Sequence, residues 1–360
     1  MLHSIKAPTP FIARPELQIL LSYARENASN NPLIVLRSGD AVPGGTGKTT
    51  LARAVAAQLR ADGLFAGHHL MLALNGAEHH KLDERTKAVR LAKEVVIESC
   101  SGVDRSELSK LNDEELNRSY KQALTTKVGL LLIDDAWSEV EVRSLLLLND
   151  SSVSTTSSTS STSTTSSSFR SICAIITTRN DIVLAGARLF DVGKLSDDDS
   201  VKILQSFEQN RNIRVDDLKK VAVKCGNVAL ALSIVGASMA RHKTFSVQKM
   251  LDSFVSKDVA NGMQSSLQWS FDALDSKLQD VLQRASMFPF SFSVNAFDGA
   301  FTVDAHEDLQ SLLHHGWLTW NRNEERFAMH DVVRDFVRKT IDSNRQVQLS
   351  DLIRKHFVRK

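Results

Sequence analysis

The order of apolar and polar positions divides the chain into two parts. In the first part, short apolar runs alternate with longer helical patterns, and this alternation predicts a parallel β-sheet flanked by helices. Strands are predicted at residues 32–37, 69–74, 128–135, 172–179 and 189–193. Four of them are continuous apolar runs, as is typical of strands buried on both faces. An α/β domain is therefore expected up to about residue 193.

After about residue 194, helical periodicity replaces the strand signals and continues to Arg354. Ser196 is expected to cap the first of these helices, because three Asp residues follow it. Further helices are predicted at residues 216–225, 228–241, 247–254, 267–274, 277–288 and 307–316. Residues 317–330 alternate around a polar turn and predict a β-hairpin, followed by a last helix at 331–341. Helices followed by a hairpin form the outline of a winged helix.

The composition is that of an ordinary globular protein. At 360 residues and 42% hydrophobic content, the chain can form two or three well-buried domains. A net charge of +2 gives no bulk attraction to nucleic acid or membranes, so neither is an expected partner. No apolar run approaches the roughly 18 to 20 residues that a membrane span needs, and the N-terminus lacks a signal-peptide layout. A cytoplasmic protein is therefore expected.

Cysteine, histidine and tryptophan side chains are expected to be structural. Cys100, Cys173 and Cys225 are widely spaced within apolar runs, which favours reduced, buried thiols over disulfides or a metal site. Adjacent histidines at 68/69, 79/80 and 314/315 point apart on a strand or helix, so solvated or capping roles are expected. The tryptophans at 137, 269, 317 and 320 lie in apolar patterns and are expected in the core.

A low-complexity tract separates the third and fourth predicted strands. Every residue from 151 to 168 except Val153 is Ser or Thr. Such a tract has nothing to bury, so it predicts a disordered surface loop. It could serve as a phosphorylation cluster. Simple repeat expansion in a permissive loop is the favoured explanation.

Residues 41–50, AVPGGTGKTT, match a phosphate-binding P-loop with an irregular entry. Strict spacing from Gly47 puts Val42 in the place of the first Gly. That spacing would extend the buried strand through residues 38–40, which are poor strand formers. We therefore expect the strand to end near Arg37 and Gly39 to be the first Gly, with Asp40 to Val42 as an insertion whose deletion preserves nucleotide binding.

The half of the loop that contacts phosphate is complete. Its glycines let backbone N–H groups approach phosphate oxygens at the positive end of the next helix. Lys48 would reach the β- and γ-phosphates, and the Thr49 hydroxyl would ligand Mg²⁺. ADP or ATP with Mg²⁺ is the expected ligand. The residues expected to contact it here are Gly44, Gly45, Thr46, Gly47, Lys48, Thr49 and Thr50.

Two acidic residues and an arginine complete the expected chemistry. The run LLLIDDAW places Asp134 and Asp135 at the end of a buried strand. Asp134 is expected to hold Mg²⁺ and Asp135 to polarise the attacking water. Arg179 ends the next predicted strand and is a candidate sensor of the γ-phosphate. The catalytic candidates are thus Lys48, Asp135 and Arg179.

Taken in order, PGGTGKTTLA, LLLIDDAW, AIITTRN, KCGNVALAL, MFPFSF and FAMHDVVRDF resemble the successive motifs of the NB-ARC family. This family is the signal-transduction ATPase module of disease-resistance and apoptosis-initiating proteins, and the resemblance runs from about Phe11 to Ile341. It implies a nucleotide-binding domain at 1–193, a helical ARC1 subdomain at 194–262 and a winged-helix ARC2 subdomain at 263–345. It further implies that these close around ADP, and that exchange for ATP opens them and permits oligomerisation.

The resemblance also assigns residues outside the P-loop. FIAR resembles the segment that wraps the adenine, which implies roles for Ile12 and Arg14. His330, within an intact Met-His-Asp motif, corresponds to the histidine that contacts the β-phosphate of ADP. Ala229 and Leu230 match the Pro-Leu of the family's Gly-Leu-Pro-Leu motif. Since Ala229 lacks the proline ring that packs on the base, we expect weaker ADP retention than in a proline-containing relative.

Three functions remain open at the level of sequence. The first is a nucleotide-operated signalling switch with slow ATP hydrolysis. The second is a DNA-associated ATPase or transcriptional regulator that reads DNA with the winged helix, although residues 308–316 contain no Lys or Arg. The third is a degenerate scaffold that binds no nucleotide.

The flanks of the resemblance are short. Ten residues precede FIAR, so protein partners are expected to act through flanking domains absent from this sequence. Residues 346–360 are expected to form a C-terminal helix or the first helix of a repeat array such as tetratricopeptide repeats.

Overall fold

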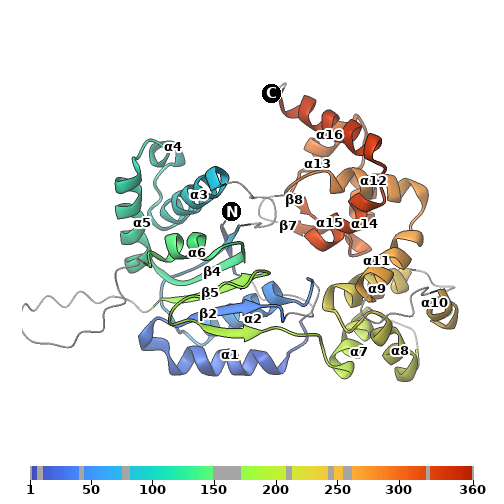
Figure 1. Cartoon of the computed structure of the whole chain (residues 1–360), viewed down its shortest axis with the longest axis horizontal. Helices are drawn as coiled ribbons and strands as arrows, with labels where there is room; N and C mark the ends of the chain where they lie inside the picture. The colour runs from blue at the N-terminus through green and yellow to red at the C-terminus, as the bar shows by residue number, and fades with distance from the viewer. Residues whose placement is uncertain are drawn as a thin grey trace, which may run out of the picture. The chain divides into compact units, whose positions relative to one another are not determined.

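The computed structural model describes residues 2–5, 11–39, 44–74, 82–148, 172–207, 213–241, 247–253, 262–321 and 325–358. The Ser/Thr tract at 151–168, the expected insertion at Asp40 to Val42 and the 79/80 histidine pair lie outside the described residues. The chain forms two compact units (Figure 1). Unit 1 contains Met1–Asp40 and Lys48–Val192, and unit 2 contains Ala41–Gly47 and Gly193–Lys360.

Unit 1 is built on a six-stranded sheet with the order β1-β3-β4-β5-β2-β6. The strands are β1 (Leu2–Ser4), β2 (Leu33–Arg37), β3 (His68–Ala73), β4 (Val128–Ala136), β5 (Cys173–Thr178) and β6 (Arg188–Asp191). The five strands from β2 to β6 are parallel, and each lies within one or two residues of its predicted bounds. The predicted parallel sheet is therefore confirmed. Only β1, which pairs antiparallel with β3, was not predicted.

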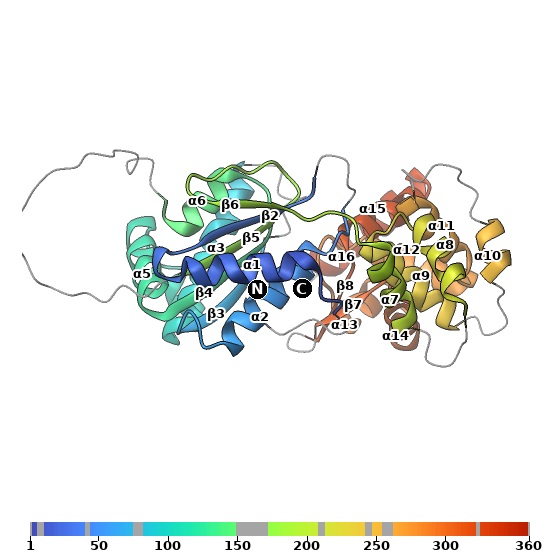
Figure 2. The same ribbon diagram turned by 90° about the horizontal axis from the view of Figure 1, so that it is seen from below.

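The helices of unit 1 cover both faces of this sheet (Figure 2). They are α1 (Pro15–Glu26), α2 (Lys48–Ala61), α3 (Leu82–Ser101), α4 (Arg105–Leu108), α5 (Asp113–Lys127) and α6 (Glu139–Leu146), with a 3₁₀ turn at Ala28–Asn30. Side chains alternate along β4, so Leu130 and Leu132 pack towards α1 and α2 while Leu131 and Ile133 pack towards α3, α5 and α6. Burial on both faces explains why the strands are continuous apolar runs.

Unit 2 is helical and ends in the expected hairpin and helix. Its elements are α7 (Asp197–Ser206), α8 (Val215–Lys224), α9 (Ala229–Arg241), α10 (Val247–Ser253), α11 (Gly262–Asp272), α12 (Ser276–Ser286), α13 (Val294–Phe301), α14 (His306–His314), β7 (Thr319–Asn321), β8 (Arg326–Ala328), α15 (Asp331–Lys339) and α16 (Ser343–Val358). Ser196 caps α7 as predicted, since its side chain accepts a hydrogen bond from the backbone N–H of Asp199. The antiparallel pairing of β7 with β8 confirms the hairpin.

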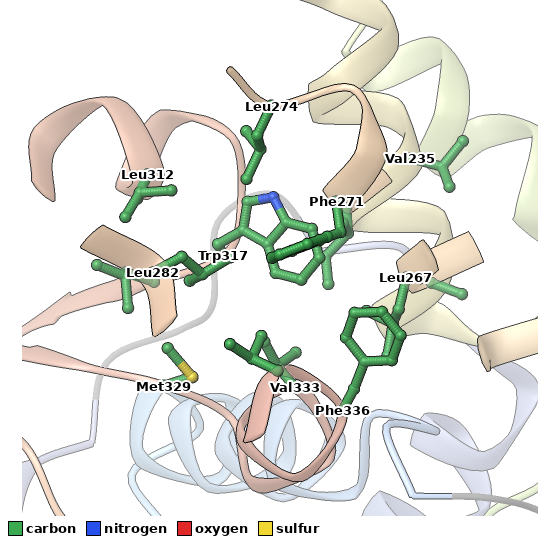
Figure 3. Close-up of a cluster of buried hydrophobic side chains, with 14 of the residues drawn as sticks. Val235, Leu267, Phe271, Leu274, Leu282, Leu312, Trp317, Met329, Val333 and Phe336 are labelled. Carbon is green, nitrogen blue, oxygen red and sulfur yellow. The ribbon is translucent and has the colours of Figure 1, made fainter. Parts of the chain in front are cut away.

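One hydrophobic core runs through the whole of unit 2. Trp317, at its centre, lies against Phe271 of α11 and Phe336 of α15, with ring centroids 6.3 and 6.4 Å away (Figure 3). Phe271 and Phe336 also contact each other, at 6.1 Å. Because α11 packs both on α9 and on α15, the helical half and the winged-helix half share side chains. A division of this unit near residue 262 stays a prediction.

Several structural side chains differ from expectation. Cys173 and Cys225 are buried, which raises the pKa of each thiol to about 12, but Cys100 is only half-buried. His69 and His315 are buried rather than solvated, because each neighbouring histidine takes the outward position. Trp269 and Trp317 lie in the core, whereas Trp137 and Trp320 are half-buried.

The described part of the chain lacks two features: a protein-only metal cluster and a membrane-spanning helix. The described residues contain no cluster of His, Cys, Asp or Glu side chains suited to hold a metal by themselves. None of the described helices combines the length and the apolar character that crossing a membrane requires.

Candidate functional site

The glycine-rich segment stands between a buried strand and a helix. Strand β2 ends at Arg37, and Lys48 begins α2. Gly45 and Gly47 have φ values of 88° and 93°, which L side chains rarely adopt. A Cβ on Gly44 would lie 2.8 Å from Cγ2 of Val332, and one on Gly45 would lie 2.8 Å from Cβ of Leu230. The glycines are therefore required by both backbone conformation and packing.

Lys48 is buried and held by the end of β2. Its side chain is 9% exposed, and its Nζ donates a hydrogen bond of 2.7 Å to Oγ of Ser38. Burial lowers the pKa of Lys48, and the charge of Arg179 lowers it further, while Asp135 and Asp134 oppose this shift. No motif in the sequence predicts Ser38 as the partner of Lys48. A desolvated ammonium group at the start of a helix is suited to bind a phosphate oxygen.

Thr49 and Asp134 meet although 85 residues separate them. The Thr49 hydroxyl donates a 2.6 Å hydrogen bond to Oδ1 of Asp134. Thr177, at the end of β5, donates a second 2.6 Å hydrogen bond to the same oxygen. Burial raises the pKa of Asp134, and these two hydroxyls act in the opposite direction. Strand β5 lies between β2 and β4, which explains why its last residues reach both strand ends.

Asp135 forms an ion pair with Arg179. Nε of Arg179 lies 2.9 Å from Oδ1 of Asp135, and the two side chains are 30% and 20% exposed. Asp135 adopts a left-handed conformation with a φ of 57°, and its backbone N–H donates to Oγ1 of Thr177 over 2.9 Å. This conformation brings the side chain of the second acidic residue to the same strand end as Asp134.

These groups fit a magnesium nucleotide. A hydroxyl and a carboxylate oxygen lie within 2.6 Å of each other, between Thr49 and Asp134. Mg²⁺ prefers such oxygen ligands and usually takes only one or two from protein, completing its shell with water and phosphate. The donor chemistry of this strand end therefore matches the expected cofactor.

The residues predicted to contact adenine lie before α1. Ile12 is half-buried in the irregular segment before α1, and Arg14 is 7% exposed at the cap position of α1. Nη2 of Arg14 bonds to Oε1 of Glu16 over 2.9 Å. Helix α1 packs on α2, the helix that begins with Lys48, and this packing holds the segment before α1 near the P-loop helix. Of the remaining P-loop residues, Thr46 is buried and Thr50 is exposed.

Unit 2 holds the other predicted residues around the glycine segment. Ala229 begins α9, and the N–H of Leu230 donates to the carbonyl of Gly45 over 3.1 Å. His330 caps α15, where its Nδ1 accepts from the N–H of Val332 over 3.2 Å. In a neutral imidazole that accepts at Nδ1, the proton is on Nε2, which is then the donor.

A buried arginine that the sequence did not single out orders the Met-His-Asp segment. Arg334 is 5% exposed, and its Nη2 donates to the carbonyl of Met329 over 3.1 Å. Its Nη1 pairs with Asp331. The arginine thus fixes the residues on both sides of His330. Its spacing of three from Asp331 was the available signal.

Two curated plant proteins are similar to this chain in sequence. The chain is 23% identical to a disease resistance protein of Arabidopsis thaliana over 322 residues, which is 81% of this chain and 30% of the relative. It is 21% identical to a putative disease resistance protein of the same plant over 243 residues, or 62% of this chain and 26% of that relative. No protein-family model matches. The chain thus spans less than a third of the length of these curated relatives.

A solved structure shares the fold of this chain. A signal transduction ATPase with numerous domains (STAND) and a tetratricopeptide repeat sensor, from Pyrococcus horikoshii, superposes with a TM-score of 0.60 and 16% identity. The match covers 94% of this chain and 44% of that protein. The NB-ARC resemblance is confirmed. The predicted P-loop NTPase fold, a parallel sheet with flanking helices followed by a helical part, is likewise confirmed.

Proposed function

We propose that this NB-ARC-like chain is a nucleotide-operated signalling switch that binds ADP or ATP. One observation carries the proposal: the Thr49 hydroxyl and the Asp134 carboxylate, 2.6 Å apart, converge next to a buried lysine and a glycine-rich turn. Desolvation raises the pKa of the half-buried Asp134 carboxylate, which is unfavourable for folding, and a bound cation at this place would offset that cost.

The nucleotide's phosphates would lie over the glycine segment. Gly44 to Gly47 would supply backbone N–H donors, and Lys48 would leave Ser38 to reach the β- and γ-phosphates. Bound Mg²⁺ would neutralise phosphate charge, with Thr49 and Asp134 as its protein-side ligands or water anchors. Ile12 and Arg14 would contact the adenine side.

Slow hydrolysis would depend on Asp135 and Arg179. Asp135 would orient and polarise a water, but its carboxylate is paired with Arg179 at 2.9 Å. A γ-phosphate would attract the guanidinium and release the carboxylate for the water. The pairing therefore supports a switch with low turnover rather than a fast ATPase.

The switch itself would rest on His330 and the start of α9. In the ADP state, Nε2 of His330 would donate to the β-phosphate and hold a closed arrangement, with Leu230 next to the base. Exchange for ATP would open it and permit self-association. Because Ala229 lacks a proline ring, ADP would leave more readily than from a proline-containing relative. We further propose a cytoplasmic setting and signalling partners reached through flanking domains, as in defence or cell-death pathways.

Titration with a fluorescent ADP analogue tests the proposal. Wild-type protein should bind with Mg²⁺-dependent affinity, and Lys48→Ala should lose most of this binding. Lys121→Ala, at an exposed position of α5, is the matched control and should bind like wild type. Absence of binding by wild type would instead identify a scaffold without a nucleotide site, and equal binding by wild type and Lys48→Ala would refute the role of Lys48.

The DNA-reading alternative receives no support from the helix before the hairpin. Helix α14 carries Glu307 and Asp308 in its first turn and contains no Lys or Arg. Phosphate contacts require cations and give a steep salt dependence. Duplex binding that weakens strongly between low and moderate salt would revive this alternative.

A further inference from the structure

The end of β4 contains an irregularity that involves both acidic residues. Ile133 pairs with Ile176 and Ala136 pairs with Thr178, so two residues of β4 face one residue of β5. This is a β-bulge, in which Asp134 and Asp135 together oppose Thr177. In a regular strand, neighbouring side chains point to opposite faces, so one of the two carboxylates would turn away from the site. The bulge allows both to serve it.

Thr177 binds both residues of the bulge through one hydroxyl. Its O–H donates to Oδ1 of Asp134 over 2.6 Å, and its oxygen accepts the N–H of Asp135 over 2.9 Å. A hydroxyl has one proton to donate and lone pairs to accept, so the two bonds are compatible. The acceptor bond gives the N–H of Asp135 a partner where the regular pairing of β4 with β5 is interrupted. The donor bond fixes the Asp134 carboxylate through the oxygen that Thr49 also contacts.

The position itself indicates a specific need for the hydroxyl. Thr177 is 2% exposed and continues a buried strand whose preceding residues, Ile175 and Ile176, are apolar. A valine would have the same shape and would avoid burying a polar group, which is unfavourable unless hydrogen bonds compensate. Thr178 is equally buried, but its hydroxyl bonds to the carbonyl of Ala136 and the N–H of Asn180. These hydrogen-bond partners are backbone groups and not carboxylates.

We propose that Thr177 is the positioning residue of the site, which holds the β-bulge and thereby aims Asp134 at the Mg²⁺ position and Asp135 at the water position. This inference deepens the proposed nucleotide switch and rests on it. It differs from the sensor role of Arg179, because Thr177 acts on the two acidic residues and not on the nucleotide.

The test compares Thr177→Val, Thr177→Ser and Thr178→Val. The main measurement is the Mg²⁺ concentration that half-saturates binding of a fluorescent, non-hydrolysable ATP analogue. Thr177→Val should raise this concentration roughly tenfold or more and leave metal-free binding within about twofold of wild type, as loss of a ligand-orienting partner does. Thr177→Ser, which restores the hydroxyl, should stay within about twofold of wild type, and so should Thr178→Val.

A second measurement needs no nucleotide. Hydrogen exchange at the Asp135 amide should accelerate in Thr177→Val but not in Thr178→Val, because only the first loses the acceptor of that N–H. Should Thr177→Val not fold, Thr177→Cys keeps the volume and donates poorly, so the same result is expected of it.

The outcomes separate the two proposals. If wild type binds no nucleotide, the proposed switch is wrong. If wild type binds but Thr177→Val has the wild-type Mg²⁺ requirement and amide exchange, the positioning role is wrong while the switch stands. An equal rise in Thr178→Val, or a failure of Thr177→Ser to restore the requirement, also overturns it, since either would reflect general disturbance of β5.

Discussion

Replacing Arg179 by alanine should separate nucleotide discrimination from stability. The change removes an ion pair with Asp135 whose members are 30% and 20% exposed. Exposed or half-exposed pairs contribute about 0.2 to 1 kcal/mol, so the free energy of unfolding should fall by no more than about 1 kcal/mol. The pair is thus a weak structural element.

On binding a triphosphate, the Arg179 guanidinium would exchange its ion pair with Asp135 for a hydrogen bond to the γ-phosphate. A charge-assisted hydrogen bond to a γ-phosphate contributes about 1.5 to 3 kcal/mol, and leaving Asp135 costs up to about 1 kcal/mol. The difference, a net gain of about 0.5 to 3 kcal/mol, corresponds to a roughly two- to hundredfold preference for the triphosphate. Arg179→Ala should lose that preference while ADP affinity stays close to wild type, because ADP has no third phosphate.

Calorimetric titration with ADP and with a non-hydrolysable ATP analogue measures this preference, and urea unfolding measures stability. Arg143→Ala is the matched control, since Arg143 forms an ion pair with Glu139 of similar exposure, 28% and 41%. Both variants should lose similar stability, and only Arg179→Ala should bind the triphosphate less well. An ADP affinity that falls as much as the affinity for the triphosphate would refute the sensor role.

Three further predictions concern the loop, a buried histidine and the core of unit 2. Gly45→Ala should lower the free energy of unfolding by about 2 kcal/mol or more in urea and abolish nucleotide binding, because Gly45 combines a φ of +88° with a position where an added Cβ would lie 2.8 Å from Cβ of Leu230. Gly193→Ala, outside the loop and with nothing within 4 Å of an added Cβ, should do neither. Burial lowers the pKa of His69 below its usual value of 6.5. The contribution of the neutral imidazole to the free energy of unfolding should therefore be complete above pH 6.5 and fall by at most about 1.4 kcal/mol per pH unit as the pH drops towards the folded-state pKa. His69→Gln should remove this pH dependence in urea unfolding. Trp317→Ala should cost about 3 to 5 kcal/mol and destabilise α9 and α15 together, as followed by hydrogen exchange; loss of protection in α15 alone would mean that the two halves fold separately.

Much of the fold could be predicted because local patterns determine it. Strands β2 to β6 are buried on both faces, so their apolar runs identify them without knowledge of their neighbours. Strand β1 has three residues and exists only through pairing with β3, which no local pattern encodes. Helix α13, Val294–Phe301, was also missed, because its eight residues include two phenylalanines and one glycine, which have low helix propensity.

The site residues that could be predicted are those that lie within a short sequence motif. Lys48, Thr49 and Asp134 follow from motifs, and the structure brings the last two together. Ser38 and Arg334 were missed, since their roles arise from partners that are set by folding. No sequence signal specified that the Thr49 and Thr177 hydroxyls converge on one carboxylate oxygen.

The pair Asp134-Asp135 shows why a motif alone does not define a site. Two consecutive residues of a regular strand face opposite sides of the sheet, so an acidic pair has one usable carboxylate unless the backbone bulges. The bulge interrupts the regular pairing and contains Asp135 at a φ of 57°, a conformation that is unfavourable unless another interaction offsets it. Thr177 supplies it from the neighbouring strand. A sequence in which Asp-Asp ends a buried strand should therefore require a buried hydroxyl opposite it for both acidic residues to act, and Thr177→Val tests that dependence directly.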